Sequence, residues 1–357
     1  MNTALSYAAA PDGVGLAYNV LPARRPGAPR LVIVADLVLG AYQLQTESPA
    51  AHGFLQALQQ HFEVLLTDPR GTGFSAGEQS TMPLSEAPDD IATVTQHLGW
   101  DRYSVLGVMI DGPRAITHAA AHPQQVSHLL LWCAPASMGR MLGTSRGQAL
   151  SELAQRDPEL FIDTLAHSLL GWDTPEESLR LARLVRTGTP SLEDLVRRVH
   201  AADADYAVES IAVPTMVMYR RQLDVLTFDM ARELVERIEG AQLALIPGSS
   251  LAPYAEPVAP VLHGIFEFLG VSDAEVAATA RSARVLDQLE QEVAELTRRQ
   301  TEVLQLLAGG MTNREIASSL DISVHTVDRH ISQIYRRIGA RGRADATGYA
   351  IRHALVD

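Results

Sequence analysis

The chain has 357 residues, of which 46% are hydrophobic and 20% are charged, so it can form two or three domains that each bury a core. Its 29 basic residues are all arginine, and its 42 acidic residues give a formal net charge of −13, which argues against a chain that coats nucleic acid along its whole length. The single cysteine, Cys133, excludes a disulfide framework and a cysteine-based zinc cluster, and no apolar run approaches the ~18 residues of a membrane span.

Short apolar segments alternate with amphipathic ones in the first part of the chain. We expect strands over residues 13–21, 31–35, 62–67, 103–107 and 126–133. We expect helices between the later strands, over residues 49–60, 86–98 and 112–121. This alternation is typical of a parallel sheet that is covered by helices on both faces. The pattern therefore predicts an α/β domain with a doubly wound sheet.

Residues 140–205 differ, because their apolar positions follow a helical period and no strand-like segment interrupts them. We interpret this insertion, which contains Trp172, as a helical lid over the sheet. The alternation then resumes, with expected strands over residues 215–219 and 242–246 and expected helices over residues 228–239 and 257–269. The first domain is therefore expected to end at residue 270.

A run of helix-forming residues follows at 271–295. The apolar residues Leu286, Leu289, Val293 and Leu296 are spaced three, four and three apart, as in about two heptads of a coiled coil. Two heptads do not distinguish a coiled coil from a solvated linker helix with one apolar stripe. We interpret the segment as a helical linker between a domain at residues 1–270 and another at residues 296–357.

Residues 12–270 resemble the α/β-hydrolase fold in the order and spacing of their segments. The resemblance is greatest to the hydrolase-like regions that are fused to signalling and transcriptional output domains. It rests on the loop Asp68-Pro-Arg-Gly-Thr-Gly-Phe-Ser75, the strand-to-helix elbow Gly107-Val-Met-Ile-Asp-Gly-Pro113, His122-Pro123, and the strand that runs from Pro214 toward Asp224. It implies an α/β-hydrolase-like doubly wound sheet with a helical lid.

The residues that an active member of this family needs are mostly missing. The nucleophile position of the elbow is Met109, whose thioether has no proton to lose, and Leu251 occupies the position of the catalytic histidine. Asp224 remains at the acid position, where it can equally bond backbone amides of its own loop. Asp36, in the turn that often supplies oxyanion-binding amides, would oppose a developing negative charge. The resemblance therefore implies a degenerate triad and no hydrolysis by the usual route.

A hydrolase cavity without catalytic groups is still a possible ligand pocket. Met109 and Leu251 would make its floor apolar, as is usual for small-molecule sites. The predicted ligand-binding residues are Asp36, Leu37, Val108, Met109, Ile110, Trp132, Trp172, Leu226 and Leu251. The alternative is that Met109 and Leu251 merely fill a collapsed core.

The C-terminal segment has the pattern of a small helical domain. A helix from residue 296 places Val303, Leu304, Leu306 and Leu307 inward and ends at Gly309-Gly310. A short helix from Thr312, a three-residue turn and a helix over residues 324–338 follow, with Ser323 as the expected N-cap. The segment resembles the LuxR-type helix-turn-helix DNA-binding domain nearly end to end, including Asn313-Arg-Glu-Ile-Ala317 and Thr326-Val-Asp-Arg-His330.

This resemblance implies that residues 324–338 form a recognition helix in the major groove of double-stranded DNA. With Val327, Ile331 and Ile334 buried, the opposite face reads the bases: Arg329 can bind guanine, His325 can donate or accept, and Asp328 can accept from cytosine. Residues 297–357 contain nine arginines and six acidic residues and carry +3, whereas the 296 residues before them carry −16. The predicted DNA-contacting residues are Asn313, His325, Thr326, Asp328, Arg329, Ser332, Gln333, Arg336, Arg337 and Arg341.

The sequence as a whole predicts a ligand-responsive transcriptional regulator that is not an enzyme and has no cofactor or metal. No charged region followed by an apolar stretch opens the chain, so we expect a cytoplasmic protein. Its expected partners are double-stranded DNA, a small-molecule effector, a second copy of the chain through residues 344–355, including Tyr349, and RNA polymerase. A bifunctional regulator with unconventional hydrolase activity and a ligand-free dimerisation scaffold remain alternatives.

Overall fold

The computed structural model describes residues 5–34, 45–46, 48–77, 84–170, 175–188, 203–223, 228–255, 257–272, 275, 298–320, 322–338, 340, 342–352 and 355. Contacts within the chain divide it into two compact units, residues 1–273 and residues 274–357. We describe each unit by itself. None of the described helices is long and apolar enough to cross a membrane.

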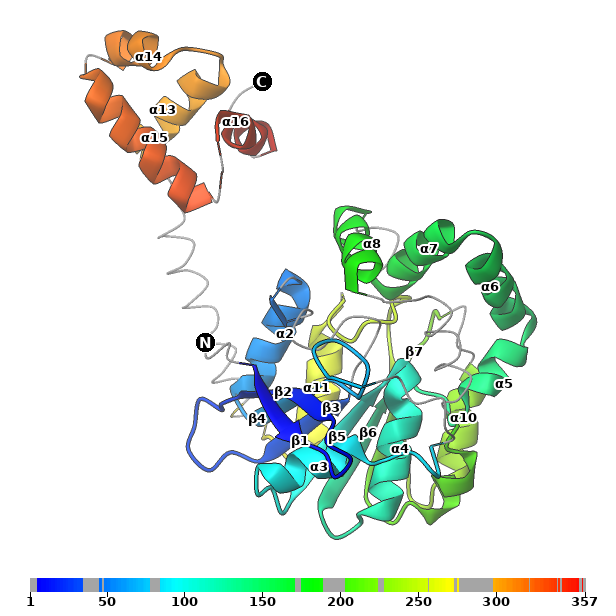
Figure 1. Cartoon of the computed structure of the whole chain (residues 1–357). Coiled ribbons are helices and arrows are strands. Elements are labelled where there is room, and N and C mark those ends of the chain that lie inside the picture. The colour runs from blue at the N-terminus through cyan, green and yellow to red at the C-terminus, as the bar shows by residue number, and fades with distance from the viewer. Residues whose placement is uncertain are drawn as a thin grey trace. The chain divides into compact units, whose positions relative to one another are not determined.

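The first unit is built on one sheet of eight strands (Figure 1). In spatial order the strands are β1 (Ser6–Ala9), β2 (Gly15–Leu21), β4 (Glu63–Thr67), β3 (Arg30–Val34), β5 (Tyr103–Val108), β6 (Val126–Trp132), β7 (Thr215–Arg220) and β8 (Gln242–Ile246). The strands from β4 to β8 are parallel to their neighbours, whereas β2 is antiparallel to both β1 and β4. The fold is the predicted α/β-hydrolase fold.

The sheet has an antiparallel edge in addition to the expected parallel strands. Strand β1 was not predicted, because its four residues are short and only Ala8 is buried. A tight turn in which Gly13 has φ +85° returns the chain directly into β2, and adjacent strands joined in this way must be antiparallel. Neither the length of β1 nor its hydrophobicity separates it from a loop.

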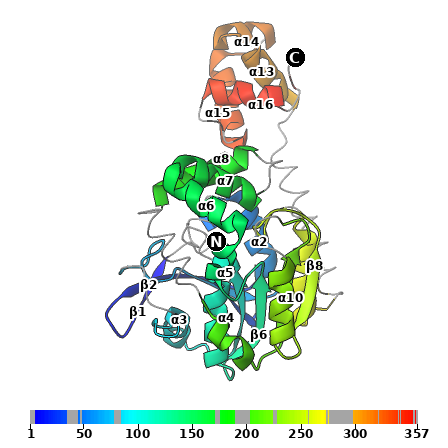
Figure 2. The ribbon, with the colours of Figure 1, turned by 90° about the vertical axis from the view of Figure 1, so that its right-hand side faces the viewer.

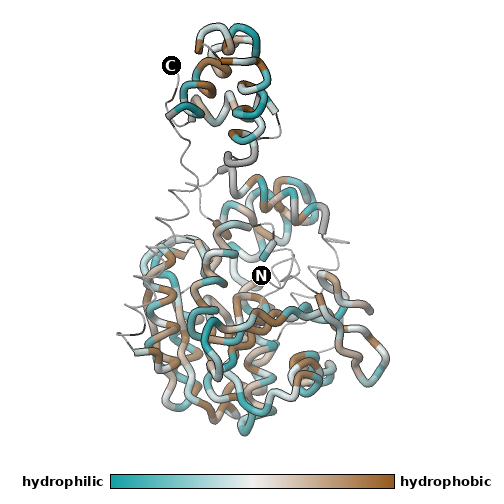
Figure 3. The backbone as a smooth tube through the Cα atoms, turned by 90° about the vertical axis from the view of Figure 1, so that its left-hand side faces the viewer, coloured by the Kyte–Doolittle hydropathy of each residue, from teal (hydrophilic) through white to brown (hydrophobic). Residues whose placement is uncertain are grey.

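Helices cover both faces of the sheet. Helix α2 (Pro49–Gln59) contacts both β4 and α11 (Ala259–Phe268), so these two helices lie on one face. Helix α4 (Gly112–Ala121) packs on β5 and β6, α3 (Asp90–His97) contacts β1 and β2, and α10 (Phe228–Arg237) contacts β7 and β8. The central strands are buried, and hydrophobic stretches concentrate in the interior (Figure 3).

The described part of the predicted insertion is largely helical. Helices α5 (Met138–Gly143), α6 (Ser145–Arg156), α7 (Pro158–Leu170) and α8 (Pro175–Gly188) pack in sequence on one another. They lie beyond the carboxyl ends of the central strands (Figures 1 and 2). The end of α7 is joined to the loop after β8 by hydrogen bonds from the amides of Leu251 and Ala252 to the carbonyls of Ser168 and Leu169, at 3.1 and 2.9 Å.

The described part of the second unit contains four helices, α13 (Arg298–Ala308), α14 (Asn313–Leu320), α15 (Val324–Ile338) and α16 (Arg343–Arg352). As the spacing predicted, its core contains Val303, Leu304, Leu307, Val327, Ile331 and Ile334, with Leu306 packed against it. Helix α16 adds Ala346 and Ala350, and Arg343 Nη2 donates to the carbonyls of Leu307 and Met311, at 2.6 Å each. The apolar stripe from Leu286 to Leu296 lies outside the described residues.

Candidate functional site

The elbow between β5 and α4 keeps its hydrolase shape although its nucleophile is absent. Met109 begins the short turn Met109–Asp111 with φ +51°, in the left-handed region that residues other than glycine seldom adopt. Two glycines make room for it: a Cβ at Gly107 would lie 2.5 Å from Ala115 Cβ, and one at Gly112 would lie 2.2 Å from Ala134 Cβ. The geometry that exposes a nucleophile is therefore retained around a buried thioether.

Three described residues of the predicted pocket, Val108, Trp132 and Leu251, lie next to one another. Val108 pairs with Trp132 in the register of β5 and β6, and Trp132 Nε1 donates to the carbonyl of Leu251 at 2.6 Å. Met109, Trp132 and Leu251 are buried, and Ile110 is half-buried. The remaining predicted residues lie outside the described part of the chain: Asp36, Leu37, Trp172, Leu226 and the acid-position Asp224.

Arg220, which sequence reasoning missed, fixes the loop that carries Leu251. This fully buried side chain ends β7 and donates through Nη1 to the carbonyls of Pro247 and Pro257, at 2.5 and 3.1 Å, and through Nη2 to that of Ala255, at 2.6 Å. Its Cζ lies 5.3 Å from the centre of the Trp132 ring. Gly248 has φ +117° and passes so close that a Cβ would lie 2.6 Å from Arg220 Nη1. The sequence signal that could have indicated this role is the position of Arg220 directly after the mostly apolar strand residues 215–219.

The other nucleophile candidates near this edge are not activated. Cys133 is fully buried, and burial raises the pKa of its thiol to about 12, so it carries no thiolate at neutral pH. Ser250 is buried, and its hydroxyl has no hydrogen-bond partner among the described residues. Asp111 is buried beside Arg114, with 3.5 Å between Oδ1 and Nε. No nucleophile–base pair is formed by these three residues.

The motif loop after β4 has a structural role. Arg70 donates to Asp90 Oδ1 through Nε and Nη2, at 3.0 and 2.7 Å, and to Asp12 through Nη1, at 2.6 Å. Ser75 Oγ donates to the carbonyl of Asp68 at 2.6 Å and accepts from the amide of Ala17 at 2.8 Å. These bonds fix the loop against α3 and β2, so the residues that carry the resemblance maintain the fold.

A cluster of one carboxylate and two imidazoles joins α3 to α4. Asp89 is the N-cap of α3, and its Oδ1 accepts from the amide of Ala92 at 2.9 Å. Its Oδ2 accepts from His118 Nδ1 at 2.7 Å and from His122 Nε2 at 3.0 Å. The Tyr103 hydroxyl lies 3.0 Å from His118 Nε2. These nitrogen and oxygen atoms could hold a metal ion.

The pKa values in this cluster reflect its hydrogen bonds. Burial alone would raise the pKa of Asp89, but the hydrogen bonds from His118 and His122 outweigh burial and hold that pKa well below its usual range. The bond to Asp89 raises the pKa of His122, and burial raises that of Tyr103 to about 12. Two features of the sequence could have indicated this cluster. One is the pair of histidines four residues apart, and the other is the acidic pair Asp89-Asp90 where an earlier helix begins.

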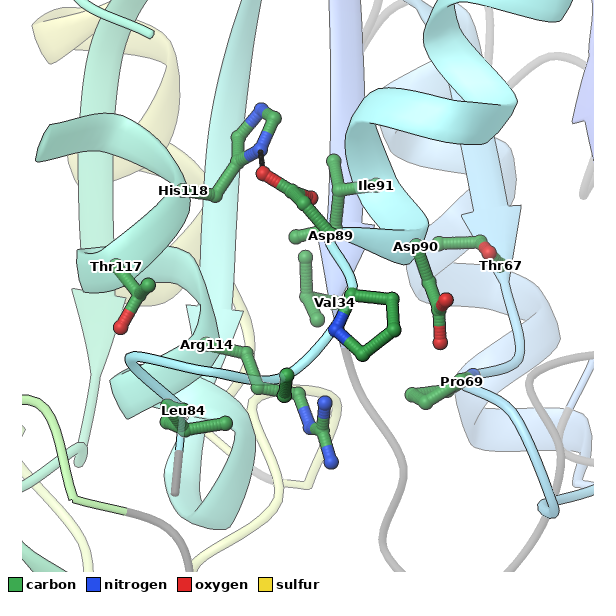
Figure 4. Close-up of a pocket in the computed structure, with 12 residues that line it drawn as sticks. Val34, Thr67, Pro69, Leu84, Asp89, Asp90, Ile91, Arg114, Thr117 and His118 are labelled. Atoms are coloured by element: carbon green, nitrogen blue, oxygen red, sulfur yellow. Dashed lines mark hydrogen bonds and ion pairs between the residues drawn. The ribbon is translucent and has the colours of Figure 1, made fainter. Parts of the chain in front are cut away.

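A small pocket lies beside this cluster, between α3 and α4 (Figure 4). Its volume of about 40 Å³ suits one or two water molecules rather than a metabolite. Its lining includes Val34, Thr67, Asp89, Arg114 and His118. Of the predicted ligand-binding residues that the structure describes, none lines it.

The described face of α15 is open to solvent. His325, Asp328, Arg329 and Ser332 are exposed, and Thr326 is half-buried. The Ser323 hydroxyl accepts from the amide of Thr326 at 3.0 Å, as expected of the N-cap. Among the described residues, Arg329 forms no ion pair or hydrogen bond, so its guanidinium is available for a partner.

Some side chains of the predicted DNA-contacting residues form hydrogen bonds within the unit. Asn313 Nδ2 donates to Asp328 Oδ1 at 2.7 Å, and Gln300 Nε2 donates to Gln333 Oε1 at 3.2 Å. The bond between Asn313 and Asp328 joins the start of α14 to the N-terminal half of α15. The sequence analysis did not predict this bond. The side chains of Arg336 and Arg337 and the whole of Arg341 lie outside the described residues. Tyr349 is half-buried on α16.

Comparison with protein families follows the division into two units. Residues 44–229, more than half of the chain, match the family model described as the alpha/beta hydrolase fold. The chain belongs to the alpha/beta hydrolase fold family. Residues 294–350 match the model of bacterial regulatory proteins of the luxR family, so the hydrolase-fold unit is combined with a LuxR-type helix-turn-helix.

Solved structures support the same fold. The chain is similar to a hydrolase from Pseudomonas aeruginosa PA01, with a TM-score of 0.63 and 21% identity over 76% of this chain and 100% of that one. It is also similar to the enol-lactonase from Burkholderia xenovorans LB400, with a TM-score of 0.60 and 21% identity over 74% of this chain and 99% of that one.

The curated relatives are regulators. The response regulator protein VraR of Staphylococcus saprophyticus is 32% identical over 102 residues, which are 29% of this chain and 48% of that protein. The transcriptional regulatory protein YxjL of Bacillus subtilis is 29% identical over 131 residues, which are 36% of this chain and 60% of that protein. The chain thus spans about half the length of these relatives.

Proposed function

We propose that this protein is a DNA-binding transcriptional regulator whose hydrolase-fold unit binds a small, largely apolar molecule without hydrolysing it. The observation that carries the proposal is the exposed face of α15, with Arg329 available, in a chain whose hydrolase elbow has a methionine in place of the nucleophile. The exposed face of α15 supports DNA binding by the second unit. The methionine at the elbow supports ligand binding without hydrolysis by the first unit.

The geometry of the second unit suits recognition in the major groove. The N-terminal turn of α15, capped by Ser323, directs backbone amides at a phosphate, while Arg329 can bind the O6 and N7 atoms of a guanine. Asn313 orients the Asp328 carboxylate, whose second oxygen can accept from a cytosine amine. Thr326, Gln333, Arg336, Arg337 and Arg341 are proposed to contact phosphates, and Ser332 lies on the same exposed face.

Charge supports a dimer on DNA. Residues 297–357 carry only +3 and the rest of the chain carries −16, so one copy makes few phosphate contacts and binds with a marked salt dependence. Two copies on half-sites about one helical turn apart double those contacts. We propose that the side of α16 opposite the buried Ala346 and Ala350 forms the interface, together with the half-buried Tyr349. We also propose that the protein is cytoplasmic and that RNA polymerase is one of its partners.

A selection from random DNA tests the reader. The full-length protein is incubated with a pool of random-sequence duplexes, bound DNA is amplified, and the affinity for the enriched duplex is compared with that for a scrambled one. We expect the enriched duplex to bind at least roughly 10³-fold more tightly. Equal affinity for both duplexes would contradict the assignment.

An ester assay tests the absence of hydrolysis. We expect purified protein to cleave p-nitrophenyl acetate and p-nitrophenyl butyrate no faster than buffer does, because Met109 supplies no nucleophile and Leu251 no base. Met109→Ser should stay inactive, since nothing takes the serine proton. Turnover that persists in Met109→Ala and disappears on changing another residue would favour the bifunctional regulator instead.

A further inference from the structure

The cluster at the junction of α3 and α4 has the chemistry of a metal site. Asp89 Oδ2, His118 Nδ1 and His122 Nε2 all lie within 4.8 Å of one another. His118 lies in the last turn of α4 and His122 is the C-cap residue that follows the helix. The centres of their two rings are 4.7 Å apart. The carboxylate comes from a separate element, the N-terminus of α3.

A metal ion could replace the two protons that now lie between Asp89 and the two imidazoles. One carboxylate oxygen accepts from both imidazoles, so two protons now lie between three atoms that can each bind a cation. When His118 gives up its Nδ1 proton, its Nε2 can carry one and donate it to the Tyr103 hydroxyl, 3.0 Å away. Such a bond from the distal ring nitrogen fixes the orientation of ligating histidines.

The cluster is accessible from solvent. The side chain of His118 is buried, but those of His122 and Asp89 are 26% and 31% exposed. The pocket beside α4 is lined by Asp89 and His118 and has room for water (Figure 4). An ion can therefore enter, and a water molecule can complete its coordination.

We propose that Asp89, His118 and His122 bind one divalent transition-metal ion of the Zn²⁺ class. Two imidazoles and one carboxylate form a ligand set that Zn²⁺ accepts, with roughly tetrahedral geometry and a fourth position for water, whereas Ca²⁺ and Mg²⁺ prefer oxygen ligands. Nitrogen and oxygen ligands about 2.0–2.2 Å from the ion require only small movements of the three side chains. The ion would link α3 to the helix that begins at the Met109 elbow.

Metal titration of the full-length, untagged protein tests the proposal. Chelator-treated protein is titrated with Zn²⁺ by calorimetry and with Co²⁺ by visible absorption, and bound metal is counted by elemental analysis after dialysis. We expect one ion per chain, the absorption of tetrahedral Co²⁺, and a rise in the thermal midpoint Tm on adding Zn²⁺. Both His122→Ala and Asp89→Asn should weaken Zn²⁺ binding more than roughly 100-fold, and Tyr103→Phe should weaken it roughly tenfold.

The variants keep the test separate from folding. His122 is partly exposed, and Asp89→Asn retains an oxygen for the amide of Ala92. His263→Ala is the matched control, since its exposed imidazole lies 3.6 Å from the Glu267 carboxylate on α11 and should contribute nothing. Less than one ion per chain, wild-type affinity in His122→Ala and Asp89→Asn, or an equal loss in His263→Ala would overturn the proposal.

Discussion

Arg329→Glu will abolish sequence-specific DNA binding. Arg329 is exposed on α15, one residue after Asp328. A bidentate contact from arginine to guanine contributes about 1–3 kcal/mol of discrimination, and a glutamate in the groove adds repulsion from the phosphates. We expect the affinity for the selected duplex to fall at least roughly 100-fold, measured by fluorescence anisotropy at fixed salt.

A control separates this effect from net charge. Arg156→Glu makes the same charge change at an exposed residue of α6, where Arg156 forms an ion pair with Glu152, and should leave DNA affinity within roughly twofold. Circular dichroism of both variants should match the wild type, because neither side chain contributes to a core. Retention of sequence-specific binding by Arg329→Glu would refute the role of α15 as the recognition helix.

Asp90→Ala will strongly destabilise the first unit, because it breaks a buried ion pair. The Arg70 and Asp90 side chains are 8% and 7% exposed, and Asp90 also accepts from the amide of Arg70 at 3.0 Å. Removing the carboxylate leaves Arg70 with only Asp12, which is 46% exposed. Breaking a buried pair costs about 3–5 kcal/mol. We expect a loss of this size in the free energy of unfolding, measured with urea by tryptophan fluorescence.

A surface pair and a double variant complete that test. Asp229→Ala removes an exposed partner of Arg232 on α10 and should cost less than about 1 kcal/mol. Arg70→Met combined with Asp90→Leu should recover part of the lost stability, because no unpaired charge remains buried. If Asp90→Ala and Asp229→Ala destabilise equally, the Arg70–Asp90 pair does not hold the loop after β4 in place.

Much of the fold follows from local pattern. Apolar strands and helical periods are encoded within 5 to 15 neighbouring residues, so the strands from β2 to β8 and the main helices of the sheet could be predicted from the sequence, as could the core of the second unit. The elbow was predicted because Gly107 and Gly112 surround Met109 at a fixed spacing. The antiparallel strand β1 was not, since its four residues carry no period.

The site residues that were missed depend on contacts between distant segments. Arg220 holds carbonyls 27 to 37 residues away, and Asp89 meets histidines 29 and 33 residues away on another helix. Asn313 meets Asp328 across 15 residues, and no propensity indicates that pairing. Val108, Trp132 and Leu251 are neighbours, as expected of adjacent parallel strands that end at the same edge of a sheet, and their role in binding a ligand stays a prediction.

The most direct test of a ligand-responsive regulator is the affinity of the full-length protein for its selected duplex with and without a bound small molecule. Small molecules extracted from the purified protein are identified by mass spectrometry and returned to ligand-free protein. The proposal predicts that the returned molecule changes the DNA affinity of the wild-type protein at least roughly fivefold. The molecule should not change the DNA affinity of Met109→Trp, because the indole would occupy the proposed binding space at the elbow. The same DNA affinity with and without the returned molecules would contradict the proposal and favour the ligand-free scaffold.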